Sequence, residues 1–164
     1  MRNKNVLYLV QGAMTAALYV VLTWLASAVG LASGVIQVRF SEALTILPYF
    51  TVAAVPGLYA GCLISNIMTG AAIWDIIFGS FATLIGAVFT YLLRKKSKWL
   101  APIPPILANI LIVPLVLMYA YGVKDAWIYL VITVGIGEVI SCGILGMILF
   151  GALEKRAGII FRNR

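Results

Sequence analysis

The run from Val6 to Ala28 contains 23 residues without a single charged side chain. An α-helix rises 1.5 Å per residue, so this run is roughly 35 Å long, enough to cross a hydrocarbon core about 30 Å thick. Similar runs follow it, and the whole chain is 63% hydrophobic and only 10% charged. Soluble domains are typically about 45–50% apolar and about 25% charged. The sequence therefore predicts an integral membrane protein.

Short polar or proline-containing segments separate the apolar runs. They divide the chain into six predicted membrane-spanning helices, at about residues 6–28, 41–52, 56–69, 75–93, 103–121 and 126–153. Pro48 should kink or shorten the second helix, and Pro114 should kink the fifth. We expect one all-α domain over residues 1–164, with both termini in the cytoplasm.

The basic residues support this topology. Of the 12 Lys and Arg residues, ten lie near the N-terminus, in the loop at 94–98 or in the C-terminal tail: Arg2, Lys4, Arg94, Lys95, Lys96, Lys98, Lys155, Arg156, Arg162 and Arg164. Such clusters mark the cytoplasmic ends of membrane helices. The net charge of +7 therefore indicates orientation in the cell membrane and does not indicate a nucleic-acid partner.

Small residues recur at helical spacing in two segments. Gly57, Gly61, Ser65 and Thr69 stand four residues apart, which predicts a smooth helix face for close packing. Ala13 and Ala17 form a similar pair in the first helix. For this pair the sequence leaves two interpretations open: packing within the monomer, or a docking surface for another membrane subunit.

Three of the five carboxylates lack an obvious local partner. Glu138 falls about 12 residues into the last helix, where a charge costs about 2.5–3.5 kcal/mol to insert. Such a residue is a functional-site candidate, although a protonated carboxyl bonded across helices is the alternative. Asp75 and Glu42 lie nearer the outer surface, and Glu42 could simply cap its helix. Arg39 can neutralise only one of the three acids.

Amide and aromatic side chains complete the predicted site. Its members beside the acids are Asn66, Asn109, Trp24, Trp74, Tyr49 and Tyr129. This lining suits a planar heterocycle with several N–H donors, or a cation, and does not suit an anion. The sequence has no histidine, no phosphate-binding loop and no nucleophile–base set. We therefore expect neither an enzyme nor a metal or cofactor site in this chain, and Cys62 and Cys142 are interpreted as small core residues.

Two longer stretches and one residue pair carry a family resemblance. V-R-F-S-E-A-L-T-I-L-P at 38–48, N-I-M-T-G-A-A-I-W-D-I-I-F-G-S-F-A-T at 66–83 and the G-E pair of the last helix closely resemble the QueT family. Its members are substrate-binding membrane subunits (S components) of energy-coupling factor (ECF) transporters, associated with uptake of queuosine precursors. The resemblance implies six helices with cytoplasmic termini and a ligand captured from outside, beneath the loop after the first helix. It also implies a transmembrane coupling subunit that docks on Ala13 and Ala17, and two cytoplasmic ATPases that use the ATP.

The ligand implied by the resemblance is a 7-deazaguanine such as 7-aminomethyl-7-deazaguanine. We expect Glu138 to accept hydrogen bonds from its guanine-like edge, and Asp75 or Glu42 to bind its ammonium group. The remaining predicted ligand contacts are Asn66 and Asn109 for other polar atoms, Trp74 for stacking, and Arg39. The alternative is a stand-alone transporter that couples proton movement, through Asp75 or Glu138, to uptake of a cationic or nucleobase-like molecule.

Overall fold

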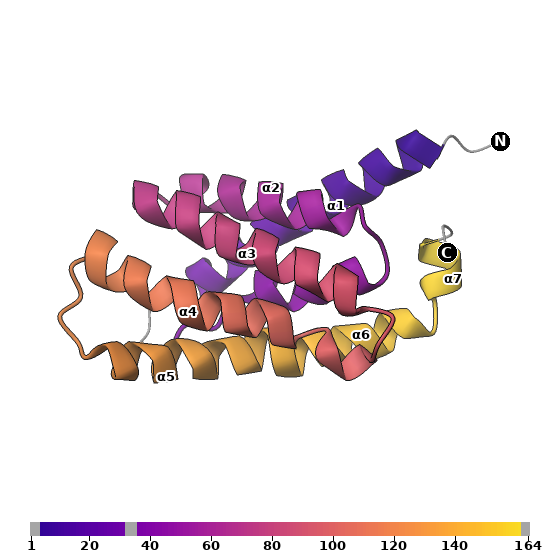
Figure 1. The fold of residues 1–164 in the computed structure, drawn as a ribbon. Coiled ribbons are helices and arrows are strands. Elements are labelled where there is room, and N and C mark those ends of the chain that lie inside the picture. Colours follow the sequence, from indigo (N-terminus) through magenta and orange to yellow (C-terminus); the bar gives the residue numbers. More distant parts are fainter. Residues whose placement is uncertain (1–3, 32–35, 162–164) are drawn as a thin grey trace.

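The computed structural model describes residues 4–31 and 36–161, and their regular structure is entirely helical (Figure 1). The α-helices are α1 (Lys4–Ala28), α2 (Ala54–Met68), α3 (Ile73–Leu93), α4 (Ile103–Ala120), α5 (Trp127–Glu138), α6 (Gly146–Glu154) and α7 (Ala157–Ile160). Two 3₁₀ segments, η1 (Phe40–Tyr49) and η2 (Lys98–Leu100), precede α2 and α4. A π-helical segment, η3 (Val139–Leu145), joins α5 to α6.

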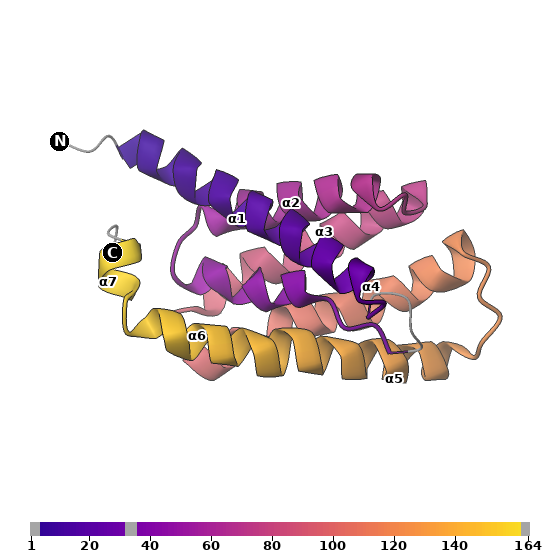
Figure 2. The same ribbon diagram turned by 180° about the vertical axis from the view of Figure 1, so that it is seen from behind.

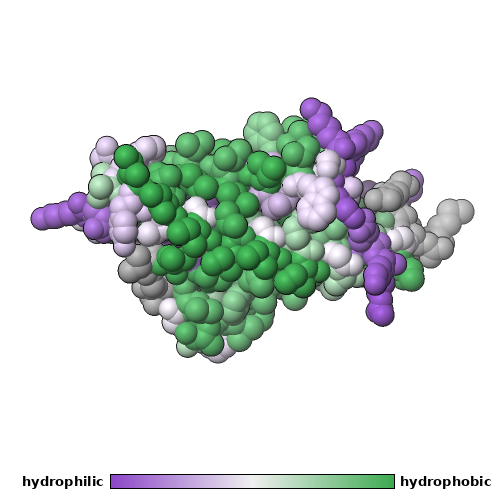
Figure 3. Space-filling view, turned by 90° about the horizontal axis from the view of Figure 1, so that it is seen from below, coloured by the Kyte–Doolittle hydropathy of each residue, from purple (hydrophilic) through white to green (hydrophobic). Residues whose placement is uncertain are grey.

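Four of the described segments are long and apolar enough to cross a membrane. They are Lys4–Ala28, Ile73–Leu93, Lys98–Ala120 and Trp127–Glu154, while α2 is a shorter apolar helix of 15 residues. In Figure 3, hydrophobic side chains cover the middle of the visible face and hydrophilic ones gather at its two ends. The prediction of a multi-pass membrane protein is confirmed.

The segment at 41–52 differs from the expected second spanning helix. It forms the ten-residue 3₁₀ helix η1, with Pro48 inside it. A 3₁₀ helix rises about 2.0 Å per residue, so η1 is roughly 20 Å long, shorter than a hydrocarbon core. The eight residues from Ser41 to Pro48 are all buried. Figure 2 shows η1 between α1 and the continuous helix formed by α5, η3 and α6, so η1 forms an inner part of the bundle.

The small-residue face of α2 packs against α1, as the sequence predicted. A Cβ atom added to Gly57 would lie 2.5 Å from the carbonyl oxygen of Gly12. One added to Gly61 would lie 2.7 Å from the Cβ of Tyr19 and 3.0 Å from the Cα of Ala16. Only glycine permits backbones to approach this closely.

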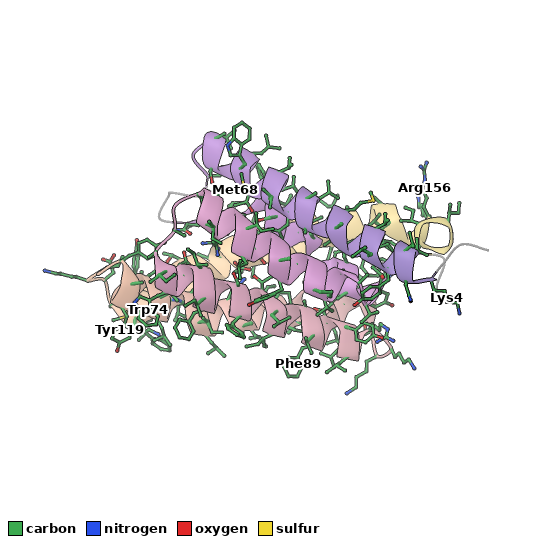
Figure 4. All side chains as sticks on the ribbon, turned by 90° about the horizontal axis from the view of Figure 1, so that it is seen from above. Lys4, Met68, Trp74, Phe89, Tyr119 and Arg156 are labelled. Carbon is green, nitrogen blue, oxygen red and sulfur yellow. The ribbon has the colours of Figure 1, made fainter. Side chains whose placement is uncertain are left out.

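The two termini lie at the same end of the bundle (Figure 1). This end, called the basic end below, also carries the turn at 50–53 and the α3–α4 connection at 94–102. Figure 4 shows the labelled Lys4 and Arg156 there, with Trp74 and Tyr119 toward the opposite end. At the basic end Lys98 Nζ lies 3.3 Å from Glu154 Oε2.

Candidate functional site

A polar cavity lies between α1, α2, α4 and the start of α3, toward the end opposite the basic end. Its large lobe has a volume of about 460 Å³. A small lobe of about 180 Å³ adjoins it and shares the lining residues Gln37, Arg39, Val113, Leu117 and Val123. The large lobe contains Asp75 and Asn66, whereas the small lobe contains Glu138.

Asp75 stands in the first turn of α3, where the positive end of the helix dipole favours a carboxylate. Its Oδ2 accepts a hydrogen bond of 3.0 Å from the Tyr121 hydroxyl, whose oxygen accepts one of 3.1 Å from the Ala72 backbone N–H. The other oxygen, Oδ1, is buried and has no partner in the described part of the chain. Buried polar atoms are almost always hydrogen-bonded, so this oxygen is suited to a ligand donor. Asn66 Nδ2 lies beside it and donates to the Asp75 backbone carbonyl at 3.4 Å.

Tyr121 follows the last residue of α4, outside the membrane-spanning part of that helix. Desolvation by burial raises the pKa of its phenol above the ordinary value, and the charge of Asp75 raises that pKa further. The hydroxyl therefore stays protonated at neutral pH and remains a donor to Asp75.

Arg39 lies between the two lobes and lines both. Its backbone N–H donates to Ser141 Oγ at 3.1 Å, which ties it to η3. Its guanidinium donates to Gln37 Oε1 at 3.4 Å. Among the described residues no carboxylate lies within the 4.0 Å ion-pair distance of this guanidinium, although the charges of Asp75 and Glu42 attract it. It therefore keeps donors for a ligand.

A buried acidic pair lies at the inner side of the small lobe. Glu42, from η1, accepts a hydrogen bond from the Tyr19 hydroxyl. Glu138, at the end of α5, accepts one of 3.2 Å from the Cys142 thiol. The buried Asn109 amide lies near both carboxylates. Glu138 lines the small lobe, whereas Glu42 is only 1% exposed and meets the cavity through Tyr19, which lines the large lobe.

The helical geometry explains how these acids meet. The π-helical segment η3 begins directly after Glu138 and carries Cys142 one turn further on, facing η1. Such π segments are frequent at functional sites. The ligating atoms of Glu42, Glu138 and Cys142 also lie within 4.8 Å of one another, close enough to hold a metal ion. The sequence placed Glu42 and Glu138 in one predicted site but interpreted Cys142 as a core residue, so it did not predict this grouping of three.

Trp74 does not join the polar cavity. Its side chain is 54% exposed and stacks on Phe78, with 6.0 Å between the ring centroids. It lines a separate apolar groove between α3 and α4, near Tyr119 (Figure 4). Successive helix residues point about 100° apart, so the rotation that turns Asp75 inward turns Trp74 outward. Trp24 is 62% exposed and Tyr49 packs on Phe150, so Tyr129 is the predicted rim aromatic that lines the cavity.

Sequence reasoning missed Tyr19, Gln37 and Tyr121. Tyr19 carries a usable signal, because Thr15, Tyr19 and Thr23 place polar groups four residues apart on one side of α1. Gln37 and Tyr121 carry no such signal, since each reaches the cavity from a loop or a helix end.

Ala13 and Ala17 are exposed on α1, on the side turned away from α2. Their neighbours Gly12 and Ala16 make the contacts with α2 instead. The surface around the pair is apolar and includes Leu9, Val10, Met14, Leu18 and Val21. Packing within the monomer therefore does not account for these two alanines, and docking on them stays a prediction.

Comparison with known proteins gives two matches. Residues 9–155 match the family model of the QueT transporter. The chain is also 32% identical over 98 residues to the queuosine precursor transporter QueT of Lactococcus lactis subsp. cremoris (strain MG1363). That alignment covers 60% of this chain and 57% of the relative, so the match spans little more than half of the relative's length. No solved structure matches.

Proposed function

The chain belongs to the QueT transporter family, and we propose that it is the substrate-binding subunit of an ECF transporter that imports a queuosine precursor. The observation that carries the proposal is the polar cavity, where the buried Oδ1 of Asp75 has no partner among the described residues. A 7-deazaguanine such as 7-aminomethyl-7-deazaguanine supplies N–H donors for such an oxygen.

The two lobes suggest how this ligand lies. The sequence paired Glu138 with the ring edge, but the free oxygen of Asp75 favours the reverse assignment. The ring edge then meets Asp75 and Asn66 in the large lobe, and the aminomethyl ammonium meets Glu138 in the small lobe. Arg39, which lines both lobes, donates to the acceptors of the ring. Glu42 holds the Tyr19 hydroxyl by a hydrogen bond, and the buried Asn109 lies near Glu138.

The topology follows from the four long segments together with η1 and α2. We place η1 and α2 as two short crossings between α1 and α3, which gives six passes. The basic end faces the cytoplasm, because its connections and termini carry the clustered Lys and Arg residues. The polar cavity then opens toward the outside.

ATP-driven transport requires partners, because this sequence has no nucleotide-binding motif. The exposed Ala13–Ala17 side of α1 is the proposed contact with the coupling subunit. Two cytoplasmic ATPases attached to that subunit supply the energy that releases the ligand inward.

Calorimetry on the purified protein tests the ligand and its orientation. The panel contains 7-aminomethyl-7-deazaguanine, the corresponding nitrile, queuine and guanine. We expect the aminomethyl compound to bind more tightly than the nitrile. Glu138→Gln should weaken binding of the aminomethyl compound roughly tenfold or more, because the charged hydrogen bond is lost, and should leave the nitrile little changed. Asp75→Asn should weaken binding of both.

The control is Glu154→Gln, which removes a carboxylate at the basic end and should leave all affinities unchanged. No binding of any 7-deazaguanine would contradict the proposed function. Binding with near-normal affinity in Glu138→Gln would remove Glu138 from the site.

Liposomes that contain only this chain separate the proposal from the proton-coupled alternative. We expect no concentrative uptake when a pH gradient is imposed. Uptake under that gradient would establish the chain as a secondary transporter.

A further inference from the structure

A second cavity lies at the basic end and shares no lining residue with the polar cavity. Its volume is about 540 Å³. It lies between the N-terminal half of α1, the turn after η1 and the end of α3, and its lining includes Gln11, Thr51, Val52, Tyr91, Arg94 and Lys95. We call it the basic-end cavity. Two of its lining residues are cations and none is an acid.

Arg94 is held in position within this cavity. Its guanidinium carbon lies 3.6 Å from the centroid of the Tyr91 ring, and its Nη1 donates to the Tyr91 backbone carbonyl at 2.7 Å. A guanidinium has five N–H donors in a fixed fork, so these contacts orient the group and leave donors for an oxyanion. Lys95 adds a second positive charge from the next residue.

The opposite wall of the cavity is tied together by side-chain hydrogen bonds. Thr51 Oγ1 donates to Gln11 Oε1 at 2.7 Å, which joins the turn after η1 to α1. Gln11 Nε2 donates to the Ile160 carbonyl at 3.3 Å, which joins α1 to α7. Arg94 and Lys95 therefore line a cavity whose other wall is held together by hydrogen bonds between α1, α7 and the turn after η1.

The surroundings favour a lipid as the source of the oxyanion. The basic end is the predicted cytoplasmic side, where anionic lipids are enriched. Val52, in the wall of the cavity, is 41% exposed. Exposed apolar side chains also stand on α1 and α3 near this end, among them Leu9 and Val88.

We propose that the basic-end cavity binds the phosphate group of an anionic membrane lipid, with Arg94 and Lys95 as its ligands. The acyl chains then lie along the exposed apolar side chains of α1 and α3. This assignment is independent of which molecule occupies the polar cavity.

Native mass spectrometry of the purified protein tests this proposal. The protein is mixed in detergent with phosphatidylglycerol, with phosphatidylcholine, or with inorganic phosphate. We expect one tightly held phosphatidylglycerol per chain and little retained phosphatidylcholine. Arg94→Gln and Lys95→Gln should each weaken retention about fivefold, the effect of one basic residue at a charged membrane surface.

Lys96→Gln is the matched control, because it removes the same charge from an exposed neighbour that does not line the cavity. Circular dichroism shows whether each variant keeps its helical content, and Lys95→Gln should fold like the wild-type protein because Lys95 is exposed. Equal losses of phosphatidylglycerol in all three variants would overturn the proposed site. They would show that the overall positive charge of the basic end attracts the lipid. Binding of inorganic phosphate without retention of phosphatidylglycerol would show that a lipid is not the source of the oxyanion in the basic-end cavity.

Discussion

At the scale of single residues, Asp75 lines the polar cavity and also contacts Tyr121 at the end of α4. One carboxylate oxygen is held by Tyr121, and the other is buried without a partner among the described residues. Because Tyr121 also accepts a hydrogen bond from Ala72, it joins the end of α4 to the α2–α3 turn. One phenol thus orients the carboxylate and fixes two neighbouring chain segments.

Tyr121→Phe removes this donor and should weaken ligand binding about three- to tenfold, since one hydrogen bond to a charged group is lost. The thermal midpoint in detergent should fall only slightly. Calorimetry and a melting curve measure the two effects. Tyr119→Phe is the control, because Tyr119 is 84% exposed and lines the outer apolar groove. Equal affinity in Tyr121→Phe and the wild-type protein would contradict a role in positioning Asp75.

At the scale of elements, the site depends on how closely η1 and its preceding loop approach the continuous helix formed by α5, η3 and α6. Gly137 faces the Gln37 backbone, and a Cβ there would collide with the Gln37 carbonyl oxygen. Gly146 faces η1, where an added Cβ would lie 3.2 Å from Ile46 Cγ2. These glycines allow the segment that carries Gln37 and Arg39 to lie against α5 and η3.

Gly137→Ala should displace the segment at 37–39 and weaken ligand binding severalfold, because the neighbour is rigid backbone. Overpacking of this kind typically costs about 1–3 kcal/mol of stability. Gly135→Ala is the matched control in the same helix, since its added Cβ would meet only the flexible end of Ile110, at 3.3 Å. Equal ligand affinities in the two variants would show that the close approach does not position the site.

At the scale of the whole molecule, an apolar middle separates two unlike ends. One end carries the termini and most of the basic residues, and the other carries the polar cavity and the α4–α5 connection, which contains Lys124. The positive-inside rule then predicts that the basic end faces the cytoplasm.

Cysteine labelling in intact cells checks this orientation. A membrane-impermeant maleimide should label Lys124→Cys from outside and should label Lys96→Cys only after the cells are opened. The unmodified protein is the background control, because Cys62 and Cys142 are both buried. The reverse labelling pattern would show that the cavity faces the cytoplasm.

Much of this architecture could be predicted from the sequence, since apolar length and small-residue spacing are local signals. The membrane class, the α2 packing face and the meeting of Asp75 with Asn66 all follow from such signals. The 3₁₀ form of η1 and the outward position of Trp74 could not be predicted. They depend on helix rotation and on contacts between distant segments, as does the pairing of Tyr19 with Glu42.

Helix α1 forms a wall of the polar cavity on one side and exposes Ala13 and Ala17 on another. A continuous helix moves largely as one rigid body. A displacement of α1 at the two alanines therefore also displaces Tyr19, which is less than two turns from Ala13. Tyr19 in turn holds Glu42. A partner that docked on the two alanines and shifted α1 would therefore also move the hydrogen bond to the innermost carboxylate.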